Sequence, residues 1–179
     1  LQQLYDIEGS DKMQILKMLT SLRQLCLEPR LVYDNIDQPS SKLKACMELI
    51  KTMQENKQKV LLFSSFTSAL GLIAEECQKA GITYYMLTGS TNKEERRELV
   101  SRFQKDDTTL FLISLKAGGT GLNLTSAENV IHYDPWWNVS AQNQATDRAY
   151  RIGQKSNVQV FNLVMKDSVE EKIIEMQKR

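Results

Sequence analysis

Short apolar runs alternate with segments of helical periodicity from residue 59 to the end of the chain. The runs have the length and the β-branched or aromatic content of buried strands, and they lie at residues 60–64, 83–87, 109–113, 129–133 and 158–164. Between and after them, apolar residues recur every three or four positions and predict helices at 68–80, 93–105, 140–152 and 168–178. Strands that alternate with helices are typical of a parallel sheet with helices on both faces. The sequence therefore predicts an α/β fold.

The N-terminal part of the chain has a different pattern. Apolar residues at helical spacing predict one helix at 10–26 and a second that begins near Leu43. The polar segment 34–41 between them is typical of a linker, and no strand is expected here. We therefore divide the chain into a helical lead-in, residues 1–57, and an α/β domain, residues 58–179.

Composition excludes several classes of protein. A formal net charge of +1 excludes a strongly basic DNA-coating protein, although it is compatible with a local phosphate-binding face. Cys26, Cys46 and Cys77 are far apart in helical apolar patterns, so we expect buried thiols in a reducing compartment and no metal site. The only histidine, His132, falls inside a predicted strand and is expected in the core. No apolar run is long enough to span a membrane, and from the start at Leu1 we expect a fragment of a longer protein.

In a parallel sheet, ligands bind beyond the carboxyl ends of the strands. The segment 88–91 reaches that edge after the second predicted strand. Thr91 and Glu94 have the spacing of a capping box, which predicts a helix start whose free N–H groups are satisfied. The same N–H groups, together with Ser90, Lys93 and Arg96, can receive a nucleic-acid phosphate. Both interpretations can hold together.

A glycine-rich segment, residues 114–121, follows the third predicted strand. Its glycines permit positive backbone angles that turn successive N–H groups inward, which makes a nest for an anion. A tight turn from strand to helix explains the same glycines equally well. The segment is not a Walker A loop, since no Lys-Ser or Lys-Thr pair follows the glycines, and its glycine spacing differs from that of a dinucleotide fingerprint.

The fourth predicted strand leads into Asp134, Pro135, Trp136 and Trp137. A carboxylate at this place can hold magnesium, but no Walker A loop is present to offer a triphosphate, so we expect Asp134 to cap or order the loop that follows it instead. Two adjacent tryptophans cannot both face one core. At least one of them is therefore expected at a surface, against a nucleic acid or a neighbouring domain.

The predicted helix 140–152 carries a narrow alanine stripe that lets it lie close on the sheet. Gln144, Arg148 and Arg151 fall on an adjoining stripe, so the arginines lie at the rim of the buried face. Asp147 and Arg151 are also spaced for an ion pair on a solvated surface. Two arginines one turn apart at the carboxyl edge of a sheet suit a phosphate group, which guanidinium groups bind with paired hydrogen bonds, and we favour this interpretation.

Three motifs, in order along the chain, resemble those of one known family. They are Gly-Gly-Thr-Gly-Leu-Asn-Leu at 118–124, Asp-Pro-Trp-Trp-Asn at 134–138 and Asp-Arg-Ala-Tyr-Arg-Ile-Gly-Gln at 147–154. Over nearly its whole length the chain resembles the second RecA-like lobe of Swi/Snf-type DNA-translocating ATPases in helicase superfamily 2. Residues 22–26 resemble the helical insertion that joins the two lobes of this family. Val139 and Tyr150 depart from the usual pattern without altering a phosphate-binding group.

The resemblance implies an ATP hydrolase whose nucleotide site is shared between two lobes. ATP and Mg²⁺ are then held mainly by an upstream lobe, which carries the Walker A loop and the magnesium carboxylates, and this chain alone is expected to be inactive. Arg148 and Arg151 match the arginine fingers of the family. Gly121, Asn123 and Gln144 match residues that face the nucleotide.

The resemblance also implies contacts with the backbone of double-stranded DNA. The matching residues are Ser90, Thr91, Ser114, Lys116 and Gly118. Trp136 and Trp137 match an aromatic motif that couples hydrolysis to movement. The implied partners are the upstream lobe, duplex DNA and a protein bound to that DNA, in a bacterial cytoplasm or in a nucleus. A stand-alone nucleic-acid-binding module and a protein-docking domain, both without an ATPase role, are the alternatives.

Overall fold

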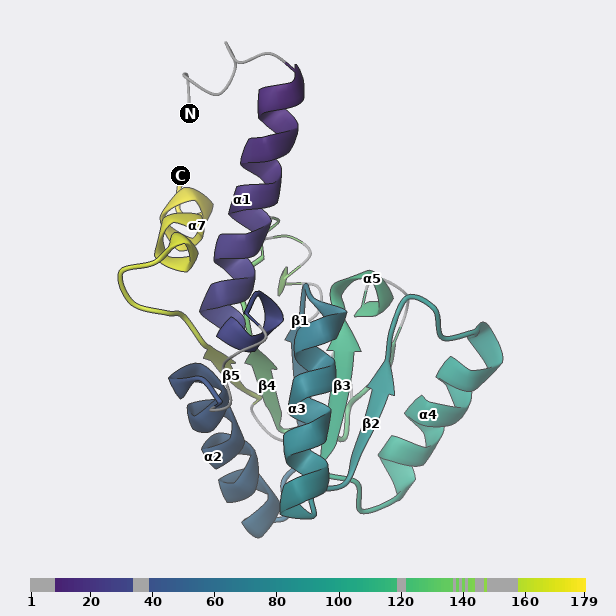
Figure 1. Cartoon of the computed structure of the whole chain (residues 1–179). Coiled ribbons are helices and arrows are strands. Elements are labelled where there is room, and N and C mark those ends of the chain that lie inside the picture. Colours follow the sequence, from purple (N-terminus) through teal and green to yellow (C-terminus); the bar gives the residue numbers. More distant parts are fainter. Residues whose placement is uncertain are drawn as a thin grey trace.

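A computed structural model of the chain describes residues 9–33, 39–118, 122–136, 138, 140, 142–143, 147 and 158–179. In this part the strands form one parallel sheet in the order β2-β3-β1-β4-β5 (Figure 1). The strands are β1 (Val60–Ser64), β2 (Tyr84–Leu87), β3 (Leu110–Ser114), β4 (Asn129–His132) and β5 (Gln159–Asn162). The predicted α/β fold is confirmed. The last predicted strand is longer than β5, which lies at the edge of the sheet and pairs on one side only.

Helices surround this sheet. They are α1 (Gly9–Leu27), α2 (Ser41–Glu55), α3 (Thr67–Ala80), α4 (Lys93–Lys105), the short α5 (Leu115–Gly118) and α7 (Val169–Gln177), with a 3₁₀ helix η2 at Pro29–Leu31. Gly81 ends α3 in the left-handed conformation, with φ of 69°, which a residue without a Cβ adopts at no steric cost. The predicted helix 93–105 has the bounds of α4. The predicted helix 140–152 lies mostly outside the described residues.

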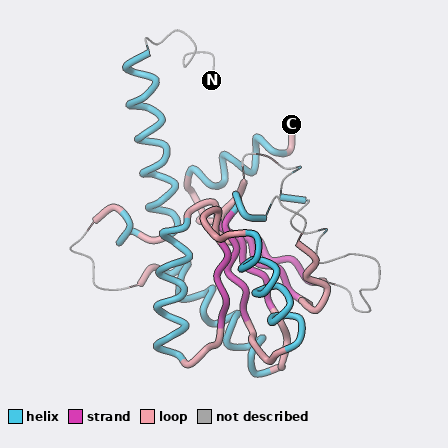
Figure 2. The backbone as a smooth tube through the Cα atoms, turned by 90° about the vertical axis from the view of Figure 1, so that its right-hand side faces the viewer, coloured by secondary structure: helices cyan, strands magenta, loops and turns pink. Residues whose placement is uncertain are grey.

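The central strand β1 explains why its sequence is a continuous apolar run. Successive side chains of a strand point to opposite faces of the sheet. Val60 and Leu62 pack in one hydrophobic cluster with side chains of α2 and α3, whereas Leu61 and Phe63 pack in a second cluster that includes α4. Both faces of β1 are therefore buried under helices, as in other parallel sheets. Figure 2 shows the strands enclosed in this way.

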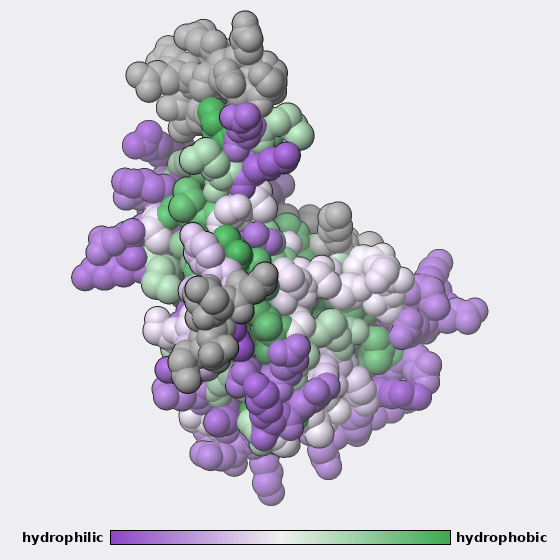
Figure 3. Space-filling model, in the orientation of Figure 1, coloured by the Kyte–Doolittle hydropathy of each residue, from purple (hydrophilic) through white to green (hydrophobic). Residues whose placement is uncertain are grey.

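Helix α1 departs from this compact arrangement. It rises beyond the carboxyl ends of the strands, so that only its C-terminal part reaches the rest of the domain (Figures 1 and 2). Met13, Leu16 and Met18 on its outer part are more than half exposed. Figure 3 shows such hydrophobic side chains among hydrophilic ones along α1. Within the described residues, no helix is both long and apolar enough to cross a membrane.

The cysteines and the histidine are where the sequence predicts them. Cys26, Cys46 and Cys77 are buried thiols in α1, α2 and α3. Burial raises the pKa of the Cys77 thiol to about 12, which keeps it protonated and unreactive at neutral pH. His132 is fully buried in β4, and burial lowers its pKa to about 4. Across the part of the chain that the structure describes, no group of three or more His, Cys, Asp or Glu side chains could hold a metal ion.

Candidate functional site

The carboxyl ends of four strands meet at one edge of the sheet. Because β1 and β3 are parallel, with Ser64 opposite Ser114, the residues that follow these two strands lie side by side. The turn 88–91 after β2 and the segment 133–136 after β4 reach the same edge. The structure thus brings together the segments that the sequence predicts at this edge.

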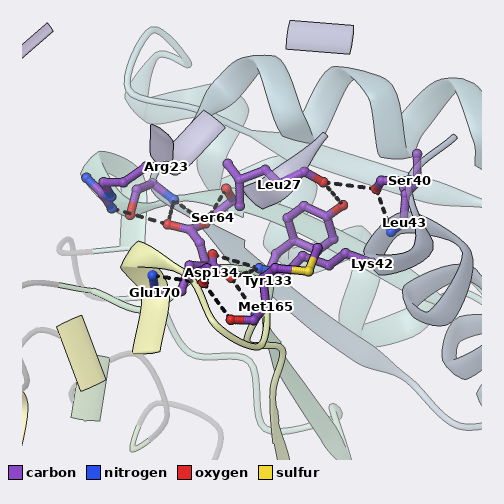
Figure 4. A network of polar contacts seen from close by, with 12 residues as sticks. Arg23, Leu27, Ser40, Lys42, Leu43, Ser64, Tyr133, Asp134, Met165 and Glu170 are labelled. Carbon is purple, nitrogen blue, oxygen red and sulfur yellow. Dashed lines mark hydrogen bonds and ion pairs between the residues drawn. The ribbon is translucent and has the colours of Figure 1, made fainter. Parts of the chain in front are cut away.

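Asp134 connects three elements at this edge, although it lies just beyond β4. Its Oδ1 accepts hydrogen bonds from Ser64 Oγ at 2.6 Å and from Ser65 N at 3.1 Å, both at the end of β1 (Figure 4). Its Oδ2 lies 3.5 Å from a guanidinium nitrogen of Arg23 in α1. We predicted that Asp134 caps or orders its own loop; its partners lie at the end of β1 and on α1. The carboxylate is buried and fully engaged, which leaves it a poor magnesium ligand.

Trp136 is buried beneath this edge and does not form a surface wedge. Its ring makes edge contacts with the rings of Phe63 and His132, at centroid distances of 5.9 and 5.6 Å. Its backbone N–H donates to Gln142 Oε1 at 3.3 Å, and its carbonyl accepts from Gln177 at the end of α7. Trp136 therefore anchors the loop. The neighbouring Trp137 lies outside the described residues, so its surface position stays a prediction.

The turn 88–91 is closed by side chains, but with a different cap from the predicted one. Asn92 caps α4, since its Oδ1 accepts from Glu95 N at 2.8 Å. Thr91 instead closes the turn, with its Oγ1 accepting from Thr88 N at 3.1 Å. The capping box of Thr91 and Glu94 is therefore wrong by one residue. Either residue type can serve as the cap, so the spacing alone could not decide between them.

The side chain of Arg96 contacts this turn and is only partly exposed to solvent. Its Nε donates to the carbonyl of Thr91 at 3.1 Å, and a terminal nitrogen donates to the carbonyl of Thr88 at 3.4 Å. The guanidinium group thus holds the turn from inside. Ser90 is exposed at the tip, where its Oγ lies 2.9 Å from Thr88 Oγ1. Of the predicted DNA-contacting residues in this turn, Ser90 is the one presented outward.

The glycine-rich segment begins as a helix. Residues 115–118 form α5 directly after β3, so Lys116 and Gly118 lie in a helical turn, and the side chain of Lys116 is outside the described part. Ser114 is buried, and its hydroxyl group has no hydrogen-bond partner among the described residues. The Oγ of Ser65, at the end of the neighbouring strand, is in the same situation. Unsatisfied buried hydroxyl groups are unusual and suit an anionic ligand that accepts from them.

The predicted nucleotide-facing residues are only partly described. Asn123 is exposed and lines a groove of about 840 Å³ between α4 and the segment that follows α5, together with Lys93, Arg97 and Lys105. Gly121, Gln144, Arg148 and Arg151 lie outside the described residues, so the arginine-finger assignment stays a prediction. 

A second network joins the lead-in to α7. Lys42 Nζ lies 2.7 and 2.8 Å from the two carboxylate oxygens of Glu170, and both side chains are buried (Figure 4). Glu170 also accepts from Met165 N at 2.8 Å. Burial raises the pKa of Glu170, and Lys42 opposes this shift. Beside this pair, the hydroxyl group of Tyr133 donates to Leu27 O at 2.8 Å, which fastens the end of α1 to the end of β4.

The sequence predictions gave no role to the side chains of Arg23, Ser65 and Lys42. Lys42 and Arg23 read as ordinary charges on amphipathic helices, and only the fold brings them against buried carboxylates. Ser65 offered a weak signal, because a second serine follows the last residue of β1 at the ligand-binding edge.

Comparison with known proteins gives a consistent result. The helicase conserved C-terminal domain family matches residues 41–153. An ATP-dependent helicase of Mycoplasma pneumoniae, itself uncharacterised, is 37% identical over 178 residues, which cover 99% of this chain and 17% of that protein. The putative ATP-dependent helicase/translocase YwqA of Bacillus subtilis is 41% identical over 169 residues, covering 90% of this chain and 18% of that protein.

A solved structure extends the similarity to three dimensions. The SWI2/SNF2 ATPase core of Sulfolobus solfataricus in complex with double-stranded DNA is similar over 99% of this chain and 38% of that one, with a TM-score of 0.80 and 34% identity. The chain thus spans less than a fifth of the length of the two curated relatives.

Proposed function

Because this chain belongs to the helicase conserved C-terminal domains of Swi/Snf-type ATPases, we propose that it serves as one lobe of a larger ATP-driven motor that moves on double-stranded DNA. The similarity to a DNA-bound ATPase core over nearly the whole chain is the observation that carries this proposal. This similarity includes the edge of the sheet at which Ser90, Ser114 and the loop of Trp136 lie.

The DNA contacts proposed at this edge are chiefly to phosphates. The hydroxyl group of Ser114 has no partner among the described residues, and Ser90 is exposed at the tip of its turn, so both can donate to phosphate oxygens. We assign Thr91, Lys116 and Gly118 to the same surface, and Arg96 to the support of the turn. Contacts of this kind give strong dependence on salt and little preference for sequence.

ATP hydrolysis in this proposal needs residues from two lobes. ATP supplies the reactive phosphoryl group, and Arg148 and Arg151 supply positive charge to it when the lobes close. Gly121, Asn123 and Gln144 face the nucleotide from this side. We assign Mg²⁺ to the upstream lobe and expect no turnover from this chain alone.

The remaining partners follow from the same arrangement. Trp136 holds the loop after β4 against the core, and Trp137 next to it is proposed to couple hydrolysis to movement. A protein bound to the DNA is the proposed object of that movement. The compartment is one that contains DNA, a bacterial cytoplasm or a nucleus.

The test is the rate of ATP hydrolysis by the full-length parent protein with and without duplex DNA. We expect duplex DNA to raise kcat by at least about tenfold, since arginine fingers that engage only on lobe closure contribute roughly 10³ to 10⁵ in rate in other phosphoryl-transfer enzymes. A parent protein that binds duplex DNA but hydrolyses ATP at one rate with or without it contradicts the proposal and favours a binding module.

A further inference from the structure

Arg23 reaches from the lead-in to the carboxyl edge of the sheet. It lies one turn before the end of α1, where its guanidinium carbon is 5.0 Å from the centroid of the Phe66 ring and a terminal nitrogen is 3.5 Å from Asp134 Oδ2. Its side chain is 15% exposed, and that of Asp134 is 2% exposed. A charged pair so far removed from water costs desolvation energy, and it is maintained only where its geometry is supported by further contacts.

Those further contacts fix the start of α3. Ser64 Oγ donates to Asp134 and accepts from Phe66 N at 3.1 Å, while Ser65 N donates to Asp134. Phe66 is the N-cap residue of α3 and provides no side-chain cap. The N–H groups of Ser65 and Phe66, the two residues that lead into α3, are thus held by Asp134 and by Ser64.

The same carboxylate begins the loop that contains Trp136. Asp134 therefore stands between two segments of the ligand-binding edge, the passage from β1 to α3 and the passage from β4 to the aromatic loop. Arg23 is the cation that balances it. Figure 4 shows Arg23 extending from α1 towards Asp134 and Ser64.

We propose that Arg23 is a positioning residue for DNA-stimulated ATP hydrolysis, which acts through Asp134 on the segments that follow β1 and β4. The proposal rests on the proposed function of the parent protein. Helix α1 projects beyond this edge and contacts it through the Arg23–Asp134 pair, so a movement of α1 is expected to change this contact. The helical lead-in then contributes to the coupling of DNA binding to ATP hydrolysis, in addition to connecting the two lobes.

A purely structural role of Arg23 is the alternative, and Arg30 provides a matched control. Arg30 is 17% exposed in the same lead-in, and its Nε lies 3.2 Å from Oε1 of Glu28, which is 1% exposed. Glu28 holds the backbone N–H of Ser40 at 2.9 Å, in the connection to α2. Loss of either arginine leaves one buried carboxylate without its cation, but only Arg23 contacts the residue that organises the edge.

The first measurement is amide hydrogen exchange in the full-length parent protein, on peptides that cover residues 63–68. Without its cation the buried carboxylate of Asp134 is expected to turn towards water, which releases Ser65 N–H. We expect Arg23→Met to speed exchange there by about tenfold, the effect of losing one net hydrogen bond. Arg30→Met is expected to leave exchange in this segment unchanged. Unchanged exchange in Arg23→Met overturns the proposal, whatever the activity of the protein.

The second measurement is steady-state ATP turnover with saturating duplex DNA. We expect Arg23→Met to lower kcat by about 10- to 100-fold, as misplacement of a catalytic segment does, with KM for ATP and Kd for DNA within about twofold of wild type. Arg23→Lys keeps the positive charge and is expected to recover part of kcat. Arg30→Met is expected to have the kcat of the wild type. Equal losses in Arg23→Met and Arg30→Met, or none in either, overturn the proposal. A wild-type parent without DNA-stimulated turnover contradicts the proposed function itself, while the exchange experiment still reports whether Arg23 orders Ser65.

Discussion

The ammonium group of Lys42 lies 2.7 Å from a carboxylate oxygen of Glu170, although the two residues are 128 positions apart in the sequence. The pair joins the start of α2 to the start of α7, and both side chains are buried. Together with the Arg23–Asp134 pair, it connects the lead-in to the end of β4 and to the C-terminal helix. The lead-in is therefore attached to the sheet through buried charges as well as through the apolar contacts of α2.

We expect the removal of one charge of the Lys42–Glu170 pair to destabilise the domain more than the removal of both. Lys42→Met leaves a buried carboxylate without its cation and is expected to reduce the free energy of unfolding by about 3–5 kcal/mol. Lys42→Met combined with Glu170→Gln removes both charges and leaves an acceptor for Met165 N–H. The double variant is therefore expected to lose much less of the free energy of unfolding than Lys42→Met alone. Urea unfolding of the three proteins measures this. A double variant that is less stable than Lys42→Met contradicts the explanation.

His132 is expected to make the domain sensitive to mild acid. Its pKa is lowered to about 4 in the folded state, against an ordinary value near 6.5, so the unfolded chain binds a proton that the folded chain refuses. This contribution to stability is complete above about pH 6.5 and is lost as the pH falls towards 4. Between about pH 7 and pH 5 the loss from this residue is about 2 kcal/mol. His132→Phe is expected to show a flatter dependence of the urea midpoint on pH. An equally steep dependence in that variant assigns the acid sensitivity to other groups.

Arg96 provides a test of direct against indirect contribution to DNA binding. If it holds the turn 88–91, Arg96→Met weakens binding but leaves the slope of log K against log salt concentration unchanged. If Arg96 contacts a phosphate directly, its loss instead makes this negative slope shallower by about 0.9. We expect the first result, because the guanidinium group is occupied by the carbonyls of Thr88 and Thr91. Fluorescence anisotropy of labelled duplex DNA over a range of salt concentrations measures both quantities.

Lys59 is expected to stabilise the opposite edge of the sheet. Its Nζ donates to three carbonyl oxygens, those of Phe103, Asp106 and Thr108, at 2.6, 2.7 and 2.9 Å. Hydrogen bonds to a charged group contribute more than neutral ones, and Lys59→Met is expected to cost about 2–3 kcal/mol in the free energy of unfolding. Lys79→Met is the control, since this lysine is largely exposed and its ion pair with Glu76 lies on a helix surface. If the two variants have the same urea midpoint, the three carbonyl contacts contribute nothing.

The sheet could be predicted from the sequence because its strands are buried on both faces. In β1 and β3 this burial requires continuous apolar runs, which contrast with the helical spacing of segments such as 93–105. The end of α3 at Gly81 was equally clear, since glycine alone takes its conformation without strain.

The candidate site was less predictable, because its contacts join distant parts of the chain. Nothing in the sequence near Asp134 indicates that its partners are Ser64 and Arg23. The burial of Trp136, rather than its exposure, depends on the space between Phe63 and His132, which only the folded sheet defines. The cap of α4 was misplaced because Thr91 and Asn92 are both good capping residues, and the choice between them depends on the geometry of the turn.

The central claim, that this chain completes an ATPase site, is tested most directly by DNA-stimulated turnover of the parent protein with Arg151→Ala. Arg102→Ala is the control, since Arg102 is exposed on α4 and pairs with Glu98 there. We expect Arg151→Ala to lower kcat by about 10³-fold or more with Kd for duplex DNA nearly unchanged, and Arg102→Ala to retain wild-type turnover. Wild-type turnover in Arg151→Ala would contradict the claim and would leave a DNA-binding module without a part in hydrolysis.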